Sequence, residues 1–488
     1  MKKLEQILSG NNALEVKGNL DVVVNDITFD SRQVKQGSCF VAVRGTQADG
    51  HGYINKAIEL GAKAIVCEVM PEKEAKGVTY VKVKDTTEIL GLMASSFYDN
   101  PSEKLKLVGI TGTNGKTTTV TLLYRLFNNL GFKSGLLSTV VNFIGNEEVP
   151  ATHTTPDAIQ LNKLLAQMVD AGCTHCFMEV SSHAVVQNRI AGLKFAGAIF
   201  SNITHDHLDY HKTFEEYLKA KKRFFDELPS DAFALVNIDD RNGRVMVQNT
   251  QARVNSYSLR SMANYKCKVI ENHFDGMLLN IDSIEVWTRL VGGFNAYNLL
   301  AIYSAARLLG VERDVVLTEL SSMTPVSGRF EHMKSPKGIN VVVDYAHTPD
   351  ALQNVIDTIN EIREPDNKLI SVVGAGGNRD KTKRPVMAKV AVEGSGMVVL
   401  TSDNPRFEEP EDILKDMKAG IEPSMIGKVL TIIDRREAIR TAYMLANPGD
   451  IVLVAGKGHE NYQEIKGVKH HFDDKEVIAE IMRNENQF

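Results

Sequence analysis

The sequence predicts an α/β protein built from three domains. A chain of 488 residues exceeds the span of one hydrophobic core, since a domain usually takes roughly 100–200 residues. Short apolar runs alternate with helical segments along the chain, and several runs open into glycine-rich loops, the pattern of parallel sheets covered by helices. We expect domains at residues 1–101, 102–332 and 333–488, with a mostly parallel sheet in the second and a Rossmann-like fold in the third.

Composition narrows the functional class. A net charge of −5 provides no overall field for nucleic acid or anionic lipid. The first ten residues include Glu5 and lack the apolar core of a secretory signal, and no later run reaches membrane-spanning length. Five cysteines form an odd, sparse set that suits a reducing compartment. We therefore expect a cytoplasmic protein that neither inserts into membranes nor binds nucleic acid.

The first domain carries candidate ligand-binding loops beside its strands. Asp30–Arg32 and Gly45–Gly50 are polar loops next to apolar runs, where ligand contacts are common. Asn100 and Pro101 mark its end. The expected strands and helix are Val22–Val24, Phe40–Val43, Ala64–Val66, Val78–Val83 and the helical segment Tyr53–Leu60.

The second domain begins with a candidate phosphate-binding loop, Lys106–Thr119. Gly112 and Gly115 allow the backbone to bend so that amide groups point at phosphate oxygens, and the helix that follows presents its positive end to the same charge. Lys116 is expected along the β- and γ-phosphates, with the Thr117 hydroxyl on Mg²⁺. The general pattern has a glycine where this chain has Ile110, but strand, turn, lysine, hydroxyl and helix together favour nucleotide binding.

Two further features of this domain follow apolar runs. Glu179 ends the run that starts at Cys176, at the expected carboxyl edge of the sheet, where a carboxylate suits Mg²⁺; a helix-capping or salt-bridged role is the alternative. Cys173 and Cys176 form a CxxC pair that could indicate zinc or redox chemistry. With no second pair nearby, we interpret both as structural.

The densest ionisable cluster raises a rival hypothesis. His205, His207 and Asp209 have the spacing that begins a dinuclear zinc hydrolase motif. That motif requires histidine directly after the aspartate, whereas this chain has Tyr210 there and His211 one residue later. The phosphate loop upstream favours the nucleotide hypothesis.

The helix expected over Phe214–Leu228 places one lysine on its apolar face. Lys221 falls on that face, while Lys219 and Lys222 point elsewhere. An inward lysine is desolvated, which favours its neutral amine and makes it available for modification or for a buried anion. A lysine that snorkels from the edge of the stripe is the alternative.

Two asparagines lie before the helix expected over Leu299–Leu309. Asn295 or Asn298 could cap that helix, and the other could contact a base edge. For residues 231–285 we expect short strands and turns without assignable chemistry.

The third domain follows a linker expected at Met333–Gly338. Three polar loops come after apolar strands and would converge at one sheet edge. Basic residues after the first loop favour an anionic ligand over a dinucleotide. The three loops are Gly374–Lys381, Asp403–Arg406 and Gly456–Glu460.

Seven motifs together resemble the Mur ligases, the ATP-dependent amino acid ligases of peptidoglycan precursor synthesis. The resemblance covers essentially the whole chain. The motifs are Gly112–Thr117, Met178–His183, Asn202–His211, Phe294–Asn298, Ser327–Glu331, Asp344–Pro349 and Asp403–Arg406.

The resemblance implies a monomeric ligase that uses ATP and two Mg²⁺ ions. Its first domain would bind UDP-N-acetylmuramoyl-L-alanyl-D-glutamate, and its third would bind meso-diaminopimelate. The γ-carboxyl of D-glutamate would be phosphorylated before an amine displaces phosphate. Lys116, Glu179, His207 and Lys221 would be catalytic, with Thr117, Glu179, His207 and carbamylated Lys221 as metal ligands.

The family pattern assigns the remaining contacts residue by residue. The ATP contacts are Gly112, Thr113, Asn114, Gly115, Lys116, Thr117, Thr118, Asn298, Arg329, Asp344 and His347. The UDP-substrate contacts are Phe29, Ser31, Thr46, Gln47, Ala48, His153, Thr154, Thr155, Ser181, Gln187 and Arg189, where His153 replaces a frequent asparagine. The diaminopimelate contacts are Arg379, Asp403, Asn404, Pro405, Arg406, Gly456 and Glu460.

The prediction that the enzyme uses diaminopimelate and not lysine depends on Arg406. Its planar fork suits the distal carboxylate of diaminopimelate, which lysine lacks, and Glu460 would meet the distal ammonium. Beside bound lysine we expect Arg406 to face no partner, at a cost of ~2–4 kcal/mol. The alternatives are a sister ligase for lysine or ornithine, a folate polyglutamylating enzyme, and a nucleotide switch without ligase activity.

Overall fold

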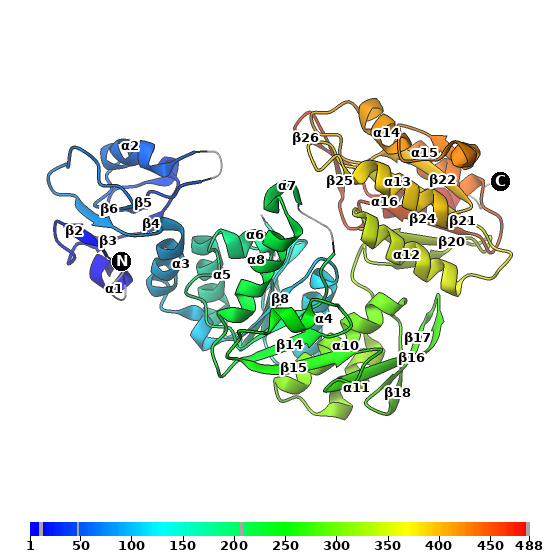
Figure 1. The fold of residues 1–488 in the computed structure, drawn as a ribbon, viewed down its shortest axis with the longest axis horizontal. Helices are drawn as coiled ribbons and strands as arrows, with labels where there is room; N and C mark the ends of the chain where they lie inside the picture. The colour runs from blue at the N-terminus through cyan, green and yellow to red at the C-terminus, as the bar shows by residue number, and fades with distance from the viewer. Residues whose placement is uncertain (9–12, 46–47, 152, 205–207, 485–488) are drawn as a thin grey trace.

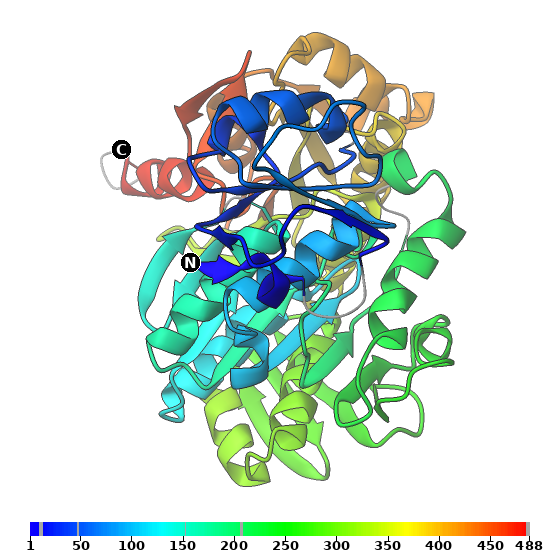
Figure 2. The same ribbon diagram turned by 90° about the vertical axis from the view of Figure 1, so that its left-hand side faces the viewer.

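The computed structural model describes residues 1–8, 13–45, 48–151, 153–204 and 208–484. Its strands form three large sheets that follow one another along the chain, and each sheet is flanked by helices. In Figure 1 the first sheet and the third lie at opposite ends of the long axis, with the central sheet between them. Figure 2, viewed from the N-terminal end, shows the third sheet behind the first.

The N-terminal sheet has five strands in the order β2-β7-β6-β5-β4. All neighbours are parallel except β2 and β7. The expected strands and helix of this region are confirmed to within one or two residues. The elements are β1 (Lys2–Lys3), α1 (Leu4–Ile7), β2 (Glu15–Lys17), β3 (Val23–Val24), β4 (Ile27–Thr28), β5 (Cys39–Val41), α2 (Ile54–Glu59), β6 (Ala64–Cys67), β7 (Thr79–Lys82) and α3 (Thr86–Phe97).

The central sheet has eleven strands, parallel in the middle and antiparallel at both ends. The stretch 231–285 supplies most of one end. The strands are β8 (Lys106–Thr111), β9 (Ser134–Leu137), β10 (Val141–Ile144), β11 (Glu147–Pro150), β12 (His175–Glu179), β13 (Gly197–Phe200), β14 (Phe233–Asn237), β15 (Arg253–Ser258), β16 (Tyr265–His273), β17 (Gly276–Ile281) and β18 (Ile284–Thr288). The helices are α4 (Lys116–Asn129), α5 (Ala158–Asp170), α6 (Ser182–Val186), α7 (Leu208–His211), α8 (Phe214–Asp226), α9 (Gly243–Met246), α10 (Gly293–Leu308) and α11 (Arg313–Ser322).

Alternation along β8 explains why helices cover both faces of the central sheet. Val108 and Ile110 point into one core with α4, α10 and α11, whereas Leu107 points into the other with α5 and α8. Because successive side chains face opposite sides, a strand that is apolar throughout requires a cover on each face. Ile110 is therefore a core residue of β8. This explains why the chain has isoleucine at a position where the general phosphate-loop pattern has glycine.

The third sheet has the order β19-β20-β24-β21-β22-β23, with only β19 antiparallel. The expected linker is wrong at its start, because Met333 and Lys334 pair with β20 as part of β19. The elements are β19 (Glu331–Lys334), β20 (Asn340–Asp344), α12 (Pro349–Ile362), β21 (Leu369–Ala375), α13 (Lys383–Gly394), β22 (Met397–Ser402), α14 (Pro410–Lys418), β23 (Val429–Thr431), α15 (Arg435–Met444), β24 (Ile451–Ala455), β25 (Tyr462–Ile465), β26 (Val468–His471) and α16 (Asp474–Asn484).

Candidate active site

The phosphate loop connects β8 to α4, and its two glycines are sterically required. Gly112 has φ +152°, and a Cβ there would lie 1.9 Å from Ser201 Oγ. Gly115 has φ +87°, and a Cβ there would lie 2.4 Å from Asn298 Oδ1. Both positions combine a left-handed backbone with close neighbours, so only glycine fits.

One detail of the expected loop is corrected by the structure. The N–H groups of Thr113 and Asn114 donate to Asn202, at 2.8 Å to its carbonyl and 2.9 Å to its side chain. These two amides hold the loop in shape instead of pointing at a ligand. The N–H groups suited to a phosphate are those of the first turn of α4, which precede the first helical hydrogen bond, from Thr119 N to Gly115 O at 3.0 Å.

Two lysines converge on one loop carbonyl. Lys116 Nζ donates to Gly112 O at 2.9 Å and to Thr113 O at 2.8 Å. Lys221 Nζ donates to the same Gly112 O at 2.8 Å, and its side chain is 1% exposed. The prediction that Lys221 faces inward is therefore confirmed. Two amines around one carbonyl create a site that favours an anion.

Glu179 ends β12 beside the phosphate loop. Its carboxylate, 1% exposed, accepts the Thr117 hydroxyl and the Thr139 N–H, each at 2.9 Å. Parallel register puts Glu179 opposite Ile110, which explains why it reaches the start of α4. Thr139 was not predicted; the only sequence signal was its position just after the short apolar run of β9.

The donor set around Thr117 fits a magnesium ion. A hydroxyl and a carboxylate are oxygen donors of the kind Mg²⁺ prefers, and Mg²⁺ usually takes its other ligands from water and phosphate. Among the described residues, no group of three His, Cys, Asp or Glu side chains is arranged as a metal site. His205 and His207 lie outside the described residues, and His211 Nε2 lies 2.8 Å from Ser182 Oγ.

Two residues from beyond the central sheet reach the phosphate loop: Arg329, just before β19, and Asp350, on α12. Arg329 Nη2 donates to Thr117 Oγ1 at 3.3 Å, and its guanidinium lies 4.6 Å from the Tyr345 ring centre. Asp350 Oδ2 accepts from Asn114 Nδ2 at 2.7 Å, and burial raises the pKa of this carboxyl. The loop thus has walls from two sheets, although Asp350 was not predicted as a site residue.

Three other predicted ATP contacts lie near these walls. Asn298 lies against Gly115, but neither asparagine caps α10, because Asn298 Nδ2 donates to Asn295 Oδ1 at 3.0 Å within the first turns. Asp344 is buried, accepts from the N–H groups of Phe330 and Ala346, and has a raised pKa caused by burial. His347 Nδ1 lies 2.9 Å from the Tyr345 carbonyl.

The predicted UDP-substrate residues divide into two groups. Those of the central domain are joined by hydrogen bonds that lead to Glu179. The Thr155 hydroxyl donates to the Glu179 carbonyl and accepts from the Ser181 N–H, and the Thr139 hydroxyl donates to that of Thr154. Arg189 donates to the Thr155 carbonyl and to Gln187 Oε1. Phe29 follows β4, Ser31 begins the short 3-10 helix Ser31–Gln33, and Ala48 lies in the loop after β5, so all three lie near the N-terminal sheet. His153 is exposed, and Thr46 and Gln47 lie outside the described residues.

The predicted diaminopimelate residues meet at the carboxyl edge of the third sheet. Asn404 Nδ2 donates to Glu460 Oε2 at 2.8 Å, and Lys457, fully buried and not predicted, lies 3.2 Å from Asn404 and 3.3 Å from Glu460. Burial and the neighbouring Asp403 raise the pKa of Glu460. Lys457 pairs with both carboxylates, at 3.6 Å to Asp403 and 3.3 Å to Glu460, so two carboxyl groups share one internal cation.

The same sheet edge also carries basic groups. A Cβ on Gly376 would lie 3.0 Å from Arg406 Nη1 and 3.8 Å from Arg379 Cγ, which brings both arginines to one loop. A Cβ on Gly377 would collide with the Pro405 carbonyl, and one on Gly456 would lie 3.0 Å from Asp403 Oδ2. Basic and acidic groups thus lie at one edge of the third sheet, as a zwitterionic ligand would require.

One premise about Arg406 is wrong. We expected an arginine without a partner whenever a ligand lacks the distal carboxylate. Instead, Arg406 Nε lies 3.4 Å from the Glu464 carboxylate, and Arg406 Nη1 donates to the Gly377 carbonyl at 2.8 Å. The pairing comes from a later hairpin, which no local pattern indicated.

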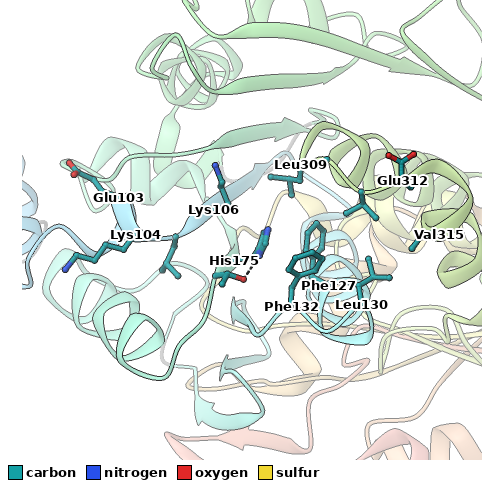
Figure 3. A pocket seen from close by; sticks show the side chains of 14 residues that line it. Glu103, Lys104, Lys106, Phe127, Leu130, Phe132, His175, Leu309, Glu312 and Val315 are labelled. Atoms are coloured by element: carbon teal, nitrogen blue, oxygen red, sulfur yellow. Dashed lines mark hydrogen bonds between the residues drawn. The ribbon is translucent and has the colours of Figure 1, made fainter.

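A separate cavity of about 650 Å³ lies at the amino edge of the central sheet (Figure 3). Lys106 and His175, which line it, begin β8 and β12, whereas the phosphate loop follows the other end of β8. Burial lowers the pKa of His175 to about 4. Cys173 and Cys176 are buried and unbridged, and burial raises the pKa of both thiols, in agreement with a structural role.

Comparison with known proteins covers the whole chain. Three family models match: Mur ligase family, catalytic domain, at residues 23–98; Mur ligase middle domain at 110–306; and Mur ligase, glutamate ligase domain, at 328–458. Within the described residues, no helix has the length and apolar character needed to cross a membrane.

Two similar curated proteins are both named UDP-N-acetylmuramoyl-L-alanyl-D-glutamate--2,6-diaminopimelate ligase. The protein from Phocaeicola vulgatus is 59% identical over 99% of this chain and 100% of its own. That from Cytophaga hutchinsonii is 60% identical over 98% and 99%. A solved structure of a protein with this name superposes with TM-score 0.71 at 32% identity, covering 99% of both chains. A folylpolyglutamate synthase from Mycobacterium tuberculosis (TM-score 0.61, 17% identity, 76% of this chain and 92% of its own) shares the fold alone.

Proposed function

Because the chain belongs to the Mur ligase family, we propose that it joins meso-diaminopimelate to the D-glutamate γ-carboxyl of UDP-N-acetylmuramoyl-L-alanyl-D-glutamate, with ATP as the energy source. The observation that carries the proposal is the phosphate loop itself, where the Thr117 hydroxyl meets Glu179 at the end of β12 and Arg329, which lies just before β19. A site walled by two sheets can bring a triphosphate and a second substrate together away from water.

The chemistry requires activation before the peptide bond forms. A carboxylate does not acylate an amine at neutral pH, so an oxygen of the γ-carboxylate attacks the γ-phosphorus of ATP and ADP leaves. The amine of the amino acid then attacks the acyl carbon, loses its proton, and expels inorganic phosphate. Negative charge accumulates in both steps, and a ligase must neutralise it.

The residues around the loop are suited to that task. We infer that Lys116 neutralises the phosphates, while the first turn of α4 donates backbone N–H groups to them. Thr117 and Glu179 would hold a magnesium ion, which when bound neutralises phosphate charge. A second ion, with His207 and a carbamylated Lys221 as ligands, remains a proposal.

The amino acid pocket would select by charge. In this proposal Glu460, supported by Asn404 and Lys457, meets the distal ammonium, and Arg406 meets the distal carboxylate. The UDP portion would contact the N-terminal sheet near Ser31. We further propose that the protein acts as a monomer in the cytoplasm.

The test is the dependence of ADP release on each substrate. ADP release should require the UDP-linked dipeptide and should be faster with meso-diaminopimelate than with L-lysine or L-ornithine. Faster turnover with lysine would refute the assigned amino acid. Equal ADP release without the dipeptide would refute the ligase reaction and favour a nucleotide switch.

A further inference from the structure

Arg406 has an internal carboxylate partner in the proposed amino acid pocket. Its Nε lies 3.4 Å from Glu464 Oε2, and the two side chains are 19% and 23% exposed. Both groups are therefore partly desolvated, and their attraction is stronger than that of a fully exposed pair.

Backbone pairing keeps the two residues adjacent. The Arg406 N–H donates to the Glu464 carbonyl at 3.0 Å, and the Lys466 N–H donates to the Arg406 carbonyl at 2.6 Å. The Glu464 N–H also donates to Asn404 Oδ1 at 2.9 Å. Strand β25 is thus docked along the loop that carries Arg406, so the contact is a built feature of the fold.

The guanidinium still has donors for a substrate. Arginine has five N–H groups in one plane. In the described structure Nε lies 3.4 Å from Glu464 Oε2 as an ion pair, and one hydrogen of Nη1 is donated to the Gly377 carbonyl. The Nη2 group and the second Nη1 hydrogen form a fork that can take one further carboxylate, with Glu464 as a negative neighbour.

We propose that Glu464 is a specificity-determining residue that lowers the preference for amino acids with a distal carboxylate. This inference rests on the proposed function. When the ligand lacks that carboxylate, Glu464 keeps Arg406 neutralised and removes most of the penalty for an unpaired arginine. When the carboxylate is present, Glu464 repels it and weakens binding.

The experiment compares Glu464→Gln with the wild-type chain in steady-state ADP release. Glutamine keeps the shape and an acceptor oxygen but removes the charge. KM for meso-diaminopimelate should fall with little change in kcat, and the kcat/KM ratio of meso-diaminopimelate over L-lysine should rise about three- to tenfold, the scale of one partly exposed ion pair. Glu464→Thr, a strand-forming uncharged residue, should raise the ratio in the same direction.

Glu409→Gln is the matched control. Glu409 pairs with Lys466 at 3.4 Å near the same hairpin, but both side chains are more than 60% exposed. This variant should leave the selectivity ratio unchanged. An unchanged ratio in both Glu464 variants, or a higher KM for meso-diaminopimelate, would overturn the inference while leaving the proposed function intact. A wild-type chain without diaminopimelate-dependent ADP release would refute both.

Discussion

Breaking the buried ion pair between Arg435 and Asp474 should strongly destabilise the third sheet. Both side chains are fully buried, with Nε to Oδ1 at 2.8 Å and Nη2 to Oδ2 at 2.7 Å. Arg435 Nη2 also donates to the Ala455 carbonyl at 3.1 Å. The pair therefore ties α15 and α16 to the end of β24.

Asp474→Asn removes the negative charge with almost no change in volume. Two unit charges about 4 Å apart attract by ~4 kcal/mol at an effective dielectric constant of 20. Removal of one partner of a buried pair usually costs about 3–5 kcal/mol, because the other charge stays buried. We expect a loss of about 4 kcal/mol in the free energy of unfolding of this sheet.

The same two helices provide the control. Arg436 pairs with Glu480 one residue along α15, but those side chains are 50% and 53% exposed. Glu480→Gln should cost at most about 1 kcal/mol. The double variant Arg435→Met with Asp474→Leu should regain most of the loss, since an apolar pair leaves no buried charge.

Hydrogen exchange is the suitable assay, because a chain with three sheets does not unfold in one step. The exchange free energy of amides in β24 should drop by about 4 kcal/mol in Asp474→Asn and by less than 1 kcal/mol in Glu480→Gln. Equal, small changes in both variants would refute the reasoning that burial makes this pair important.

Three further predictions concern the central domain. Glu179→Gln should raise the Mg²⁺ concentration for half-maximal ADP release at least about tenfold, because a carboxylate ligand is lost; an unchanged Mg²⁺ titration would contradict the metal assignment. His175, with a pKa of about 4 against 6.5 in the unfolded chain, makes stability fall as pH drops from 6.5 to 4, by up to about 3 kcal/mol. His175→Phe should abolish that decline in urea titrations followed by Trp287 fluorescence, and a decline of the same size would count against it. Lys221→Ala should lose ADP release and regain part of it with acetate or formate if the lysine acts as a carbamate; full activity without additive would exclude that role.

Local sequence patterns predicted the structure correctly where the pattern lies within one helix, strand or turn. The inward position of Lys221 followed from the 3.6-residue period of α8, and the structure leaves that side chain 1% exposed. The strand, turn and helix around Gly112 were equally readable, because the positive φ that Gly112 and Gly115 adopt is a local requirement of the turn.

Contacts between distant segments could not be predicted in this way. The Asn202 side chain accepts from the Asn114 N–H, 88 residues earlier in the chain. Asp350 accepts from the Asn114 side chain across 236 residues. Glu464 pairs with Arg406 only because a hairpin docks on the loop. Such partners depend on how sheets and loops pack. From the sequence alone, each of these residues is recognisable only as a polar residue, and its partner is not.

Transfer of an isotope label tests the central claim most directly. The account requires an acyl phosphate, so an oxygen of the substrate γ-carboxylate must leave with phosphate. With ¹⁸O at both oxygens of that carboxylate, each peptide bond formed in the presence of ATP and meso-diaminopimelate should release one phosphate that carries one ¹⁸O atom. Product formation with unlabelled phosphate would contradict activation by ATP at the γ-carboxyl.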